Sequence, residues 1–205
     1  GTGKTYLLNA IISYADSKRI NICASALSGI AATLLTRGKT AHAHHKIPIP
    51  CHHDGSCSLT RRSRGGRQLI NARVIIIDEV SMMTKHQLDI IDKSLQQLMR
   101  NQLPFGNKFV ILAGDFRQCL PVIKRGSKAE ILSNTLKRSH LWSRFQKMQL
   151  TINERVRRNA SNGNAEEVLN FSNMLLSIGN GTFPTVPNTI AESSIALPTN
   201  VVFDK

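Results

Sequence analysis

Acidic residues are scarce in this sequence, and their scarcity is the first indication of what the chain binds. The 205 residues include 13 Asp and Glu against 27 Lys and Arg, which gives a formal net charge of +14. Such an excess of positive charge favours a polyanionic partner, nucleic acid above all. Charge alone leaves open the alternative of a basic protein whose lysines are simply solvated.

Long apolar runs, paired cysteines and aromatic residues are also few. No stretch approaches 18 apolar residues, so the sequence predicts no membrane span. The four cysteines lack the even spacing of a secreted disulfide framework, which favours a reducing compartment. Aromatic residues make up 5% of the chain, so a platform for stacking bases would use few side chains. Phe116, Trp142 and His42 are the candidates, although the core is the simpler place for Trp142.

One short segment raises a zinc hypothesis. Cys51–Cys57 reads CHHDGSC, and His44 and His45 precede it. The C-x₅-C spacing departs from the usual C-x₂₋₄-C, and no second Cys or His pair follows. We therefore expect residues 49–68, rich in His, Ser, Gly and Arg, to form a polar surface loop.

The chain opens on GTGKT, the pattern that ends a phosphate loop, G-x-x-x-x-G-K-[ST], whose leading glycine would lie upstream. In such a loop backbone N–H groups surround the phosphates, Lys4 reaches the β- and γ-phosphates and the Thr5 hydroxyl binds Mg²⁺. Apolar residues between Leu7 and Ile12 recur at helical spacing, so the N-terminal end of a helix should face the phosphates. The predicted nucleotide-binding residues of this segment are Gly1, Thr2, Gly3, Lys4 and Thr5.

A second segment, VIIIDEVSM at Val74–Met82, predicts a buried parallel strand that ends in two acids. Asp78 would hold the Mg²⁺ ion and complete the nucleotide site. Glu79 would polarise a water for in-line attack on the γ-phosphate. Taken alone, the segment could be a capped strand with solvated acids. Together with GTGKT about 75 residues earlier, it indicates an ATP- or GTP-hydrolysing phosphate-loop enzyme.

A third apolar run, Phe109–Asp115, should place Asp115 and Gln118 at the carboxyl edge of a neighbouring strand, where ligands bind in open α/β sheets. An amide there can hydrogen-bond both the γ-phosphate and the attacking water, so we predict that Gln118 is a γ-phosphate sensor; a polar turn is the alternative. A further strand at Ile20–Ala26 and an apolar helical face over Leu88–Leu98 complete the pattern. The predicted fold class is α/β, a RecA-like domain with a doubly wound, mainly parallel sheet.

The ordered segments GTGKT, SGIAATLL with GKTAHA, IIIDEVSMM, GDFRQCLPV and SHLWSRFQKMQLTINERVR resemble the Pif-type DNA helicases of superfamily one, which are relatives of the RecD helicases. The resemblance extends from Gly1 to about Gly181. KIPIP at Lys46–Pro50, with Ser56 and Cys57, is more like the branch related to transposon-encoded Helitron helicases. The resemblance implies a 5′→3′ translocase, driven by ATP and Mg²⁺, that binds single-stranded DNA and unwinds duplex junctions. It also implies roles in DNA repair, recombination and telomere or genome maintenance, and an intracellular, nuclear or mitochondrial location.

The resemblance further implies roles for individual residues. Arg155, in NERVR, falls where such helicases have an arginine that contacts the γ-phosphate, and it follows an expected strand end at Met148–Leu150. Glu154 replaces a usual methionine and could divert that guanidinium. Ser28, Gly29 and His42 fall in the segments that meet the DNA strand.

Basic residues are clustered in two stretches. Between Asp54 and Asp78 there is no acid but five arginines, and from Lys137 to Arg158 seven Lys and Arg stand against one acid. Such clusters can neutralise phosphates and release counterions. From the two lines of reasoning together, the predicted DNA contacts are Ser28, Gly29, His42, Arg61, Arg62 and Arg64.

We expect residues 1–158 to form a first motor domain, and 159–205 to form a linker, a helix over Glu166–Ile178 and an irregular tail that leads toward a second motor domain. Two alternatives remain at this point. Another phosphate-loop ATPase, such as a clamp or helicase loader, would not need SGIAA, TAH and GDFRQ in order. Intact Lys4, Asp78, Glu79 and Gln118 argue against a non-catalytic, transposon-derived DNA-binding remnant. The sequence does not indicate whether the protein is a monomer or an oligomer.

Overall fold

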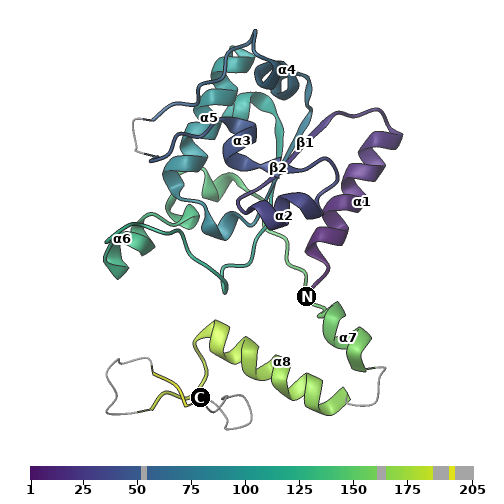
Figure 1. The fold of residues 1–205 in the computed structure, drawn as a ribbon, viewed down its shortest axis with the longest axis vertical. Coiled ribbons are helices and arrows are strands. Elements are labelled where there is room, and N and C mark those ends of the chain that lie inside the picture. Colours follow the sequence, from purple (N-terminus) through teal and green to yellow (C-terminus); the bar gives the residue numbers. More distant parts are fainter. Residues whose placement is uncertain (52–54, 161–164, 187–193, 197–205) are drawn as a thin grey trace. The chain divides into compact units, whose positions relative to one another are not determined.

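The computed structural model describes residues 1–51, 55–160, 165–186 and 194–196 (Figure 1). Contacts divide the chain into two compact units, Thr2–Thr151 and Gly1 with Ile152–Lys205. Within the described part of the chain, no helix is long and apolar enough to cross a bilayer. In chain order the elements are α1 (Lys4–Ser17), β1 (Ile22–Ala26), α2 (Gly29–Leu34), β2 (Lys39–Thr40), α3 (Ala41–His45), α4 (Arg64–Asn71), β3 (Val74–Asp78), η1 (Val80–Met82), α5 (Lys85–Met99), η2 (Pro104–Asn107), β4 (Phe109–Leu112), α6 (Lys128–Ser133), η3 (Leu136–Arg138), η4 (Trp142–Arg144), α7 (Glu154–Ala160) and α8 (Ala165–Asn180).

The larger unit is built on a parallel sheet. Among the described residues its strands follow the order β2-β1-β3-β4. The register pairs Ala26 with Asp78 and Ile77 with Leu112, so the carboxyl ends of β1, β3 and β4 lie along one edge. The predicted parallel α/β sheet is therefore confirmed. Apolar, β-branched runs form these strands because both faces of a parallel sheet are covered.

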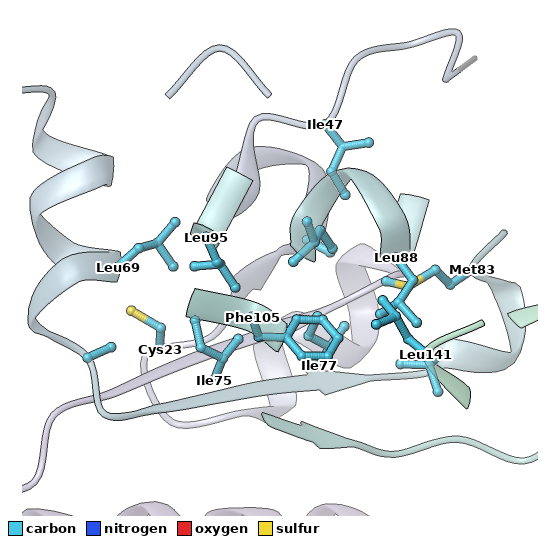
Figure 2. Packing of buried hydrophobic residues seen from close by; sticks show 14 of the residues in the cluster. Cys23, Ile47, Leu69, Ile75, Ile77, Met83, Leu88, Leu95, Phe105 and Leu141 are labelled. Carbon is cyan, nitrogen blue, oxygen red and sulfur yellow. The ribbon is translucent and has the colours of Figure 1, made fainter. Parts of the chain in front are cut away.

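Side chains of the central strand β3 alternate between two apolar layers. Ile76 packs with Leu8 and Ile12 of α1 on one face. Ile75 and Ile77 point to the other face, where they meet residues of α4 and α5 (Figure 2). All three isoleucines of β3 have no exposed surface, and each such burial stabilises the fold by about 1.5–3 kcal/mol. Helices on both faces give the doubly wound arrangement (Figure 1).

Helix α5 runs from the carboxyl edge of the sheet back toward the amino edge. Its start is set by a capping box, in which the Thr84 hydroxyl accepts from Gln87 N and the Gln87 side chain accepts from Thr84 N. The segment after α6 packs along this helix, because Lys85 N donates to Asn134 O over 2.8 Å and Leu136 is completely buried. This packing brings the segment that contains Trp142 close to the carboxyl edge.

Two local predictions were wrong. The loop predicted for residues 49–68 ends early, because α4 begins at Arg64, where the Ser63 hydroxyl caps it and Leu69 anchors it with no exposed surface. The strand expected at Met148–Leu150 is absent, since none of residues 146–153 belongs to a helix or strand. Met148 is 93% exposed, so this short segment, with two apolar residues around Gln149 and no neighbouring strand, does not form a strand here.

The smaller unit contains two packed helices, α7 and α8. The helix predicted over Glu166–Ile178 is confirmed as α8. Asn153 Nδ2 donates to Ser172 Oγ over 3.1 Å, which ties the start of α7 to α8. Helix α7 ends at Ala160, two residues inside the segment predicted to be a linker.

Candidate active site

The candidate site begins where Gly3 turns the chain into α1. Gly3 has φ 79° and ψ 18°, in the left-handed region that glycine adopts most readily. Its carbonyl accepts the first helical hydrogen bond, from Leu7 N at 3.0 Å. No acidic residue stands in the first turn of α1, so the partial positive charge of the helix end is available to an anion.

Lys4 lies in that first turn and contacts both acids at the end of β3, Asp78 and Glu79. Its Nζ is 3.0 Å from Asp78 Oδ1 and 2.7 Å from Glu79 Oε1. Burial by itself would lower the pKa of Lys4, but the hydrogen bonds and negative charges of the two carboxylates outweigh burial and raise it. Lys4 is therefore a fixed cation, and the predicted meeting of phosphate loop and acid pair is observed within one unit.

The two acids differ in backbone and in burial. Asp78 ends β3 with 1% of its surface exposed, and its Oδ1 accepts from Glu79 N at 2.8 Å. Glu79 has φ 57° and ψ 36°, a left-handed conformation that costs a non-glycine residue about 1–3 kcal/mol. A bond from Val80 N to Ala113 O, 3.0 Å long, holds this turn against the extension of β4. Asp78 is thus an anchored carboxylate, whereas Glu79 projects from a turn with 22% of its side chain exposed.

The chemistry of these groups fits Mg²⁺ together with a nucleotide. Asp78 and Glu79 bring two negative charges and Lys4 only one positive charge, so a cation would be attracted. The Asp78 carboxylate and the Thr5 hydroxyl are hard oxygen donors of the kind Mg²⁺ prefers. In the described part of the chain no cluster of three or more His, Cys, Asp or Glu could hold a metal ion without other ligands. Phosphate oxygens and water would have to complete the coordination.

Gln118 lies in the turn Asp115–Gln118 that follows β4, hereafter the sensor turn. Gln118 N donates to Asp115 O at 3.1 Å, and the Gln118 side chain is exposed. Burial alone would raise the pKa of Asp115, but hydrogen bonds from Arg117 and the charges of Arg117 and Lys4 lower it. The charge of Lys4 therefore reaches Asp115 of the sensor turn.

Two of the predicted DNA contacts lie at the same edge of the sheet. Leu27 N donates to Asp78 O at 3.0 Å, and Ser28 follows as the N-cap of α2, its hydroxyl accepting from Ala31 N. Gly29 is exposed, and a side chain there would meet nothing within 4 Å. The backbone at Gly29 is therefore open to an approaching strand.

His42 lies on α3, next to the first turn of α5. Its Nε2 is 3.3 Å from Nε2 of Gln87, which belongs to the capping box of α5. That first turn lies near the carboxyl edge of the sheet. The geometry thus brings His42 toward the same side of the unit as Ser28.

The three arginines predicted to contact DNA lie elsewhere. The Arg61 guanidinium donates to the carbonyl of Leu98, at the C-terminal end of α5, while Arg62 and Arg64 are exposed. Helix α5 has 15 residues, about 22 Å of length, so this cluster lies near the opposite edge from Lys4. The sequence did not indicate this separation.

Arg155 and Gly1 belong to the other unit. Arg155 is exposed in the first turn of α7. Glu154 Oε2 pairs with Arg157 Nη2 at 3.1 Å, so the acid beside Arg155 has a different partner. The roles of Gly1 and Arg155 at the nucleotide stay predictions.

The histidines of the zinc hypothesis are buried. His44 is 7% exposed and His45 is 1% exposed, with ring centroids 5.4 Å apart. Burial, with the nearby charge of Lys39, lowers the pKa of His44 to about 4. Burial, with His44 nearby, lowers that of His45 to about 3. The burial of His44 and His45 is explained by their packing in the core as neutral rings. His52 and His53 lie outside the described residues.

Sequence patterns missed one polar group beside the site. Ser81, two residues after Glu79, is 1% exposed, and its hydroxyl has no hydrogen-bond partner among the described residues. A Cβ added at Gly114 would lie 3.1 Å from Ser81 N, so the chain before the sensor turn passes very close. A serine within an apolar segment offers no pattern by which its burial could be predicted.

Known proteins resemble this chain over most of its length. Residues 1–189 match the family of PIF1-like helicases. The ATP-dependent DNA helicase Pif1 of a Psychrobacter species is 38% identical over 128 residues, which cover 62% of this chain and 19% of that protein. A Pif1 helicase from Bacteroides, solved with ADP-AlF3 and single-stranded DNA, is 29% identical with a TM-score of 0.71 and covers 90% of this chain and 41% of its own.

A Pif1 structure described as unwinding forked double-stranded DNA by two coordinating helicases is 28% identical, with a TM-score of 0.65. It covers 89% of this chain and 42% of its own. The chain thus spans less than half the length of these relatives. The likeness to them confirms the predicted RecA-like fold class. With a match over residues 1–189, the chain belongs to the family of PIF1-like helicases.

Proposed function

We propose that this chain is the first motor domain of an ATP-dependent DNA helicase that translocates 5′→3′ on single-stranded DNA and unwinds duplex junctions. The observation behind the proposal is the contact of one lysine with both acids, Lys4 with Asp78 and Glu79, at the carboxyl edge of a parallel sheet. Support comes from relatives named ATP-dependent DNA helicase Pif1 and from a relative solved with ADP-AlF3 and single-stranded DNA.

In the proposed reaction the residues of this edge divide the work. Lys4 exchanges its carboxylate partners for the β- and γ-phosphates, which leaves Glu79 able to accept a hydrogen bond from water. Mg²⁺, held by Thr5 and Asp78, would neutralise charge on the phosphate oxygens. Glu79 directs the water at the γ-phosphorus and accepts a proton from it. The water oxygen forms the new P–O bond, and the bond to the β–γ bridging oxygen breaks to release ADP and phosphate. Gln118 would hydrogen-bond the γ-phosphate and that water.

The DNA strand is proposed to cross the same edge, over Ser28, Gly29 and His42. Gly29 is open to solvent, and the N-cap Ser28 lies two residues after the end of β1, which pairs with β3. A change at the nucleotide therefore has a short path to the DNA. A second motor domain would supply the rest of the nucleotide site. We place the protein inside the cell, in the nucleus or mitochondria, with roles in DNA repair, recombination and telomere or genome maintenance.

The test is Glu79→Gln in the full-length protein. The amide keeps the size of the side chain but cannot take a proton, so Mg·ATP binding should persist while DNA-stimulated turnover falls by orders of magnitude. Glu166→Gln, at an exposed glutamate on α8, is the matched control and should turn over normally. Near-normal hydrolysis by Glu79→Gln would refute the assignment. Nucleotide binding without turnover in the unaltered protein would support the non-catalytic remnant instead.

A further inference from the structure

The sensor turn contacts a second segment of the chain through an aromatic pair. The ring of Phe116 meets Trp142 edge-to-face, with centroids 5.5 Å apart and planes at 79°. Lys137 Nζ lies over the Phe116 ring, 4.4 Å from its centroid. An edge-to-face pair and a cation over a ring are both attractive arrangements. Phe116 therefore contacts both an indole and an ammonium group.

The Trp142 side of this contact rests on the core. The Trp142 ring contacts the ring of Phe145, with centroids 6.4 Å apart. Phe145 in turn contacts Phe105, with centroids 5.7 Å apart. Phe105 is 5% exposed, and the neighbouring Leu136 and Leu141 are 0% and 2% exposed. These residues belong to the same apolar cluster as the buried residues of α5. Trp142 therefore packs against the close-packed core of the larger unit.

The sensor turn is anchored much less firmly. Its acid, Asp115, pairs only locally with Arg117, both side chains being 36% exposed, and Gln118 is exposed. Among the side chains described for the turn, Phe116 is the one that packs on the apolar cluster. The place of Gln118 relative to Lys4 therefore depends on Phe116, and the place of Phe116 depends on Trp142.

We propose that Trp142 is a positioning residue for ATP hydrolysis: through Phe116 it sets the sensor turn, and through the same contact the basic segment Lys137–Lys147 registers whether nucleotide is bound. The inference rests on the proposed function, in which this edge of the sheet binds ATP. Lys137 is part of the contact, so a DNA phosphate that binds its ammonium group would shift the turn. Binding at either site then alters binding at the other, as coupling between sites requires.

Trp142 is the single tryptophan of these 205 residues, so in this chain its emission reports the contact directly. Addition of Mg²⁺ and the non-hydrolysable analogue adenylyl imidodiphosphate should change the intensity or wavelength of Trp142 emission. In Phe116→Leu that response should disappear, while competition against a fluorescently labelled ADP still shows binding. Phe109→Leu is the matched control. Phe109 is the first residue of β4, the strand that leads to the sensor turn, and it is 67% exposed, so this variant should keep both nucleotide binding and the emission response.

Turnover gives an independent measurement. Trp142→Leu should lower the kcat of DNA-stimulated ATP hydrolysis about tenfold to a hundredfold with little change in KM, because a small misplacement of a positioning group costs this much. Trp142→Phe keeps an aromatic edge and should recover most of the rate. Circular dichroism establishes that each variant is folded, and a misfolded Trp142→Leu leaves Phe116→Leu as the deciding variant.

The outcomes separate this inference from the proposed function. Binding of the nucleotide without any change in Trp142 emission, or an unchanged response in Phe116→Leu, overturns the positioning role alone. Wild-type kcat in folded Trp142→Leu does the same. Failure of the unaltered protein to bind nucleotide overturns the proposed function and this inference together.

Discussion

Acidification should destabilise the larger unit through His44 and His45. Both rings are buried in the folded chain, and His44 Nδ1 and His45 Nε2 have no hydrogen-bond partner among the described residues. Burial lowers the pKa from the ordinary 6.5 to about 4 for His44 and about 3 for His45. In the unfolded chain each ring regains its ordinary pKa and takes up a proton below pH 6.5.

The sign and the size follow from proton linkage. Between pH 6.5 and about 4 the unfolded state binds more protons than the folded state, so the free energy of unfolding falls as pH falls. Where the unfolded state binds one more proton than the folded state, the free energy of unfolding changes by about 1.4 kcal/mol per pH unit. From pH 7 to pH 5 each histidine should therefore lower the free energy of unfolding by roughly 2 kcal/mol. Two histidines together amount to about 4 kcal/mol, a large part of the 5–15 kcal/mol typical of a folded protein.

Urea unfolding at pH 7 and pH 5 measures this loss. The double variant His44→Gln, His45→Gln has no imidazole to titrate, so its stability should fall by about 4 kcal/mol less than that of the parent between the two pH values. Ile12→Val, in the other core layer, is the control: it should cost about 0.5–1.5 kcal/mol at both pH values and leave the pH dependence unchanged. An equal pH dependence in the parent and in the double variant would refute the assignment of two buried, neutral histidines.

Three further predictions concern arginines. Arg62→Ser with Arg64→Ser should flatten the dependence of log K on log[salt] for single-stranded DNA by up to about 1.4 if both contact phosphates, and an unchanged slope assigns them to solvent. Arg61→Ser should instead lower the free energy of urea unfolding by about 1 kcal/mol, because it removes the bond to the end of α5; equal stability would contradict that role. Arg155→Ala in the full-length protein should slow ATP turnover by about 10³–10⁵ and leave nucleotide binding intact, whereas Arg157→Ala should mainly weaken DNA binding. If Arg157 proves rate-critical, the predicted register is wrong by two residues.

Local sequence was sufficient for the parts of the fold that repeat a simple pattern. The apolar run before Asp78 predicted β3, and apolar residues at helical spacing predicted α1 and α5. The same logic failed at Met148–Leu150, where two apolar residues have no strand beside them. It failed again at Arg64, because a Ser63 cap and one buried leucine outweighed a polar, glycine-containing segment.

What the sequence determined by itself is the chemistry at the edge of the sheet. A glycine that turns the chain into α1, a lysine in the first turn and two acids after a buried strand must converge, because parallel strands end at one edge and the helix begins there. Tertiary structure alone decided the rest. It placed Arg61 near the far end of α5, buried His44 and His45 as neutral rings, and set Trp142 against Phe116. These contacts join residues far apart in the chain through packing, and no local pattern of residue types records which distant side chains share a surface.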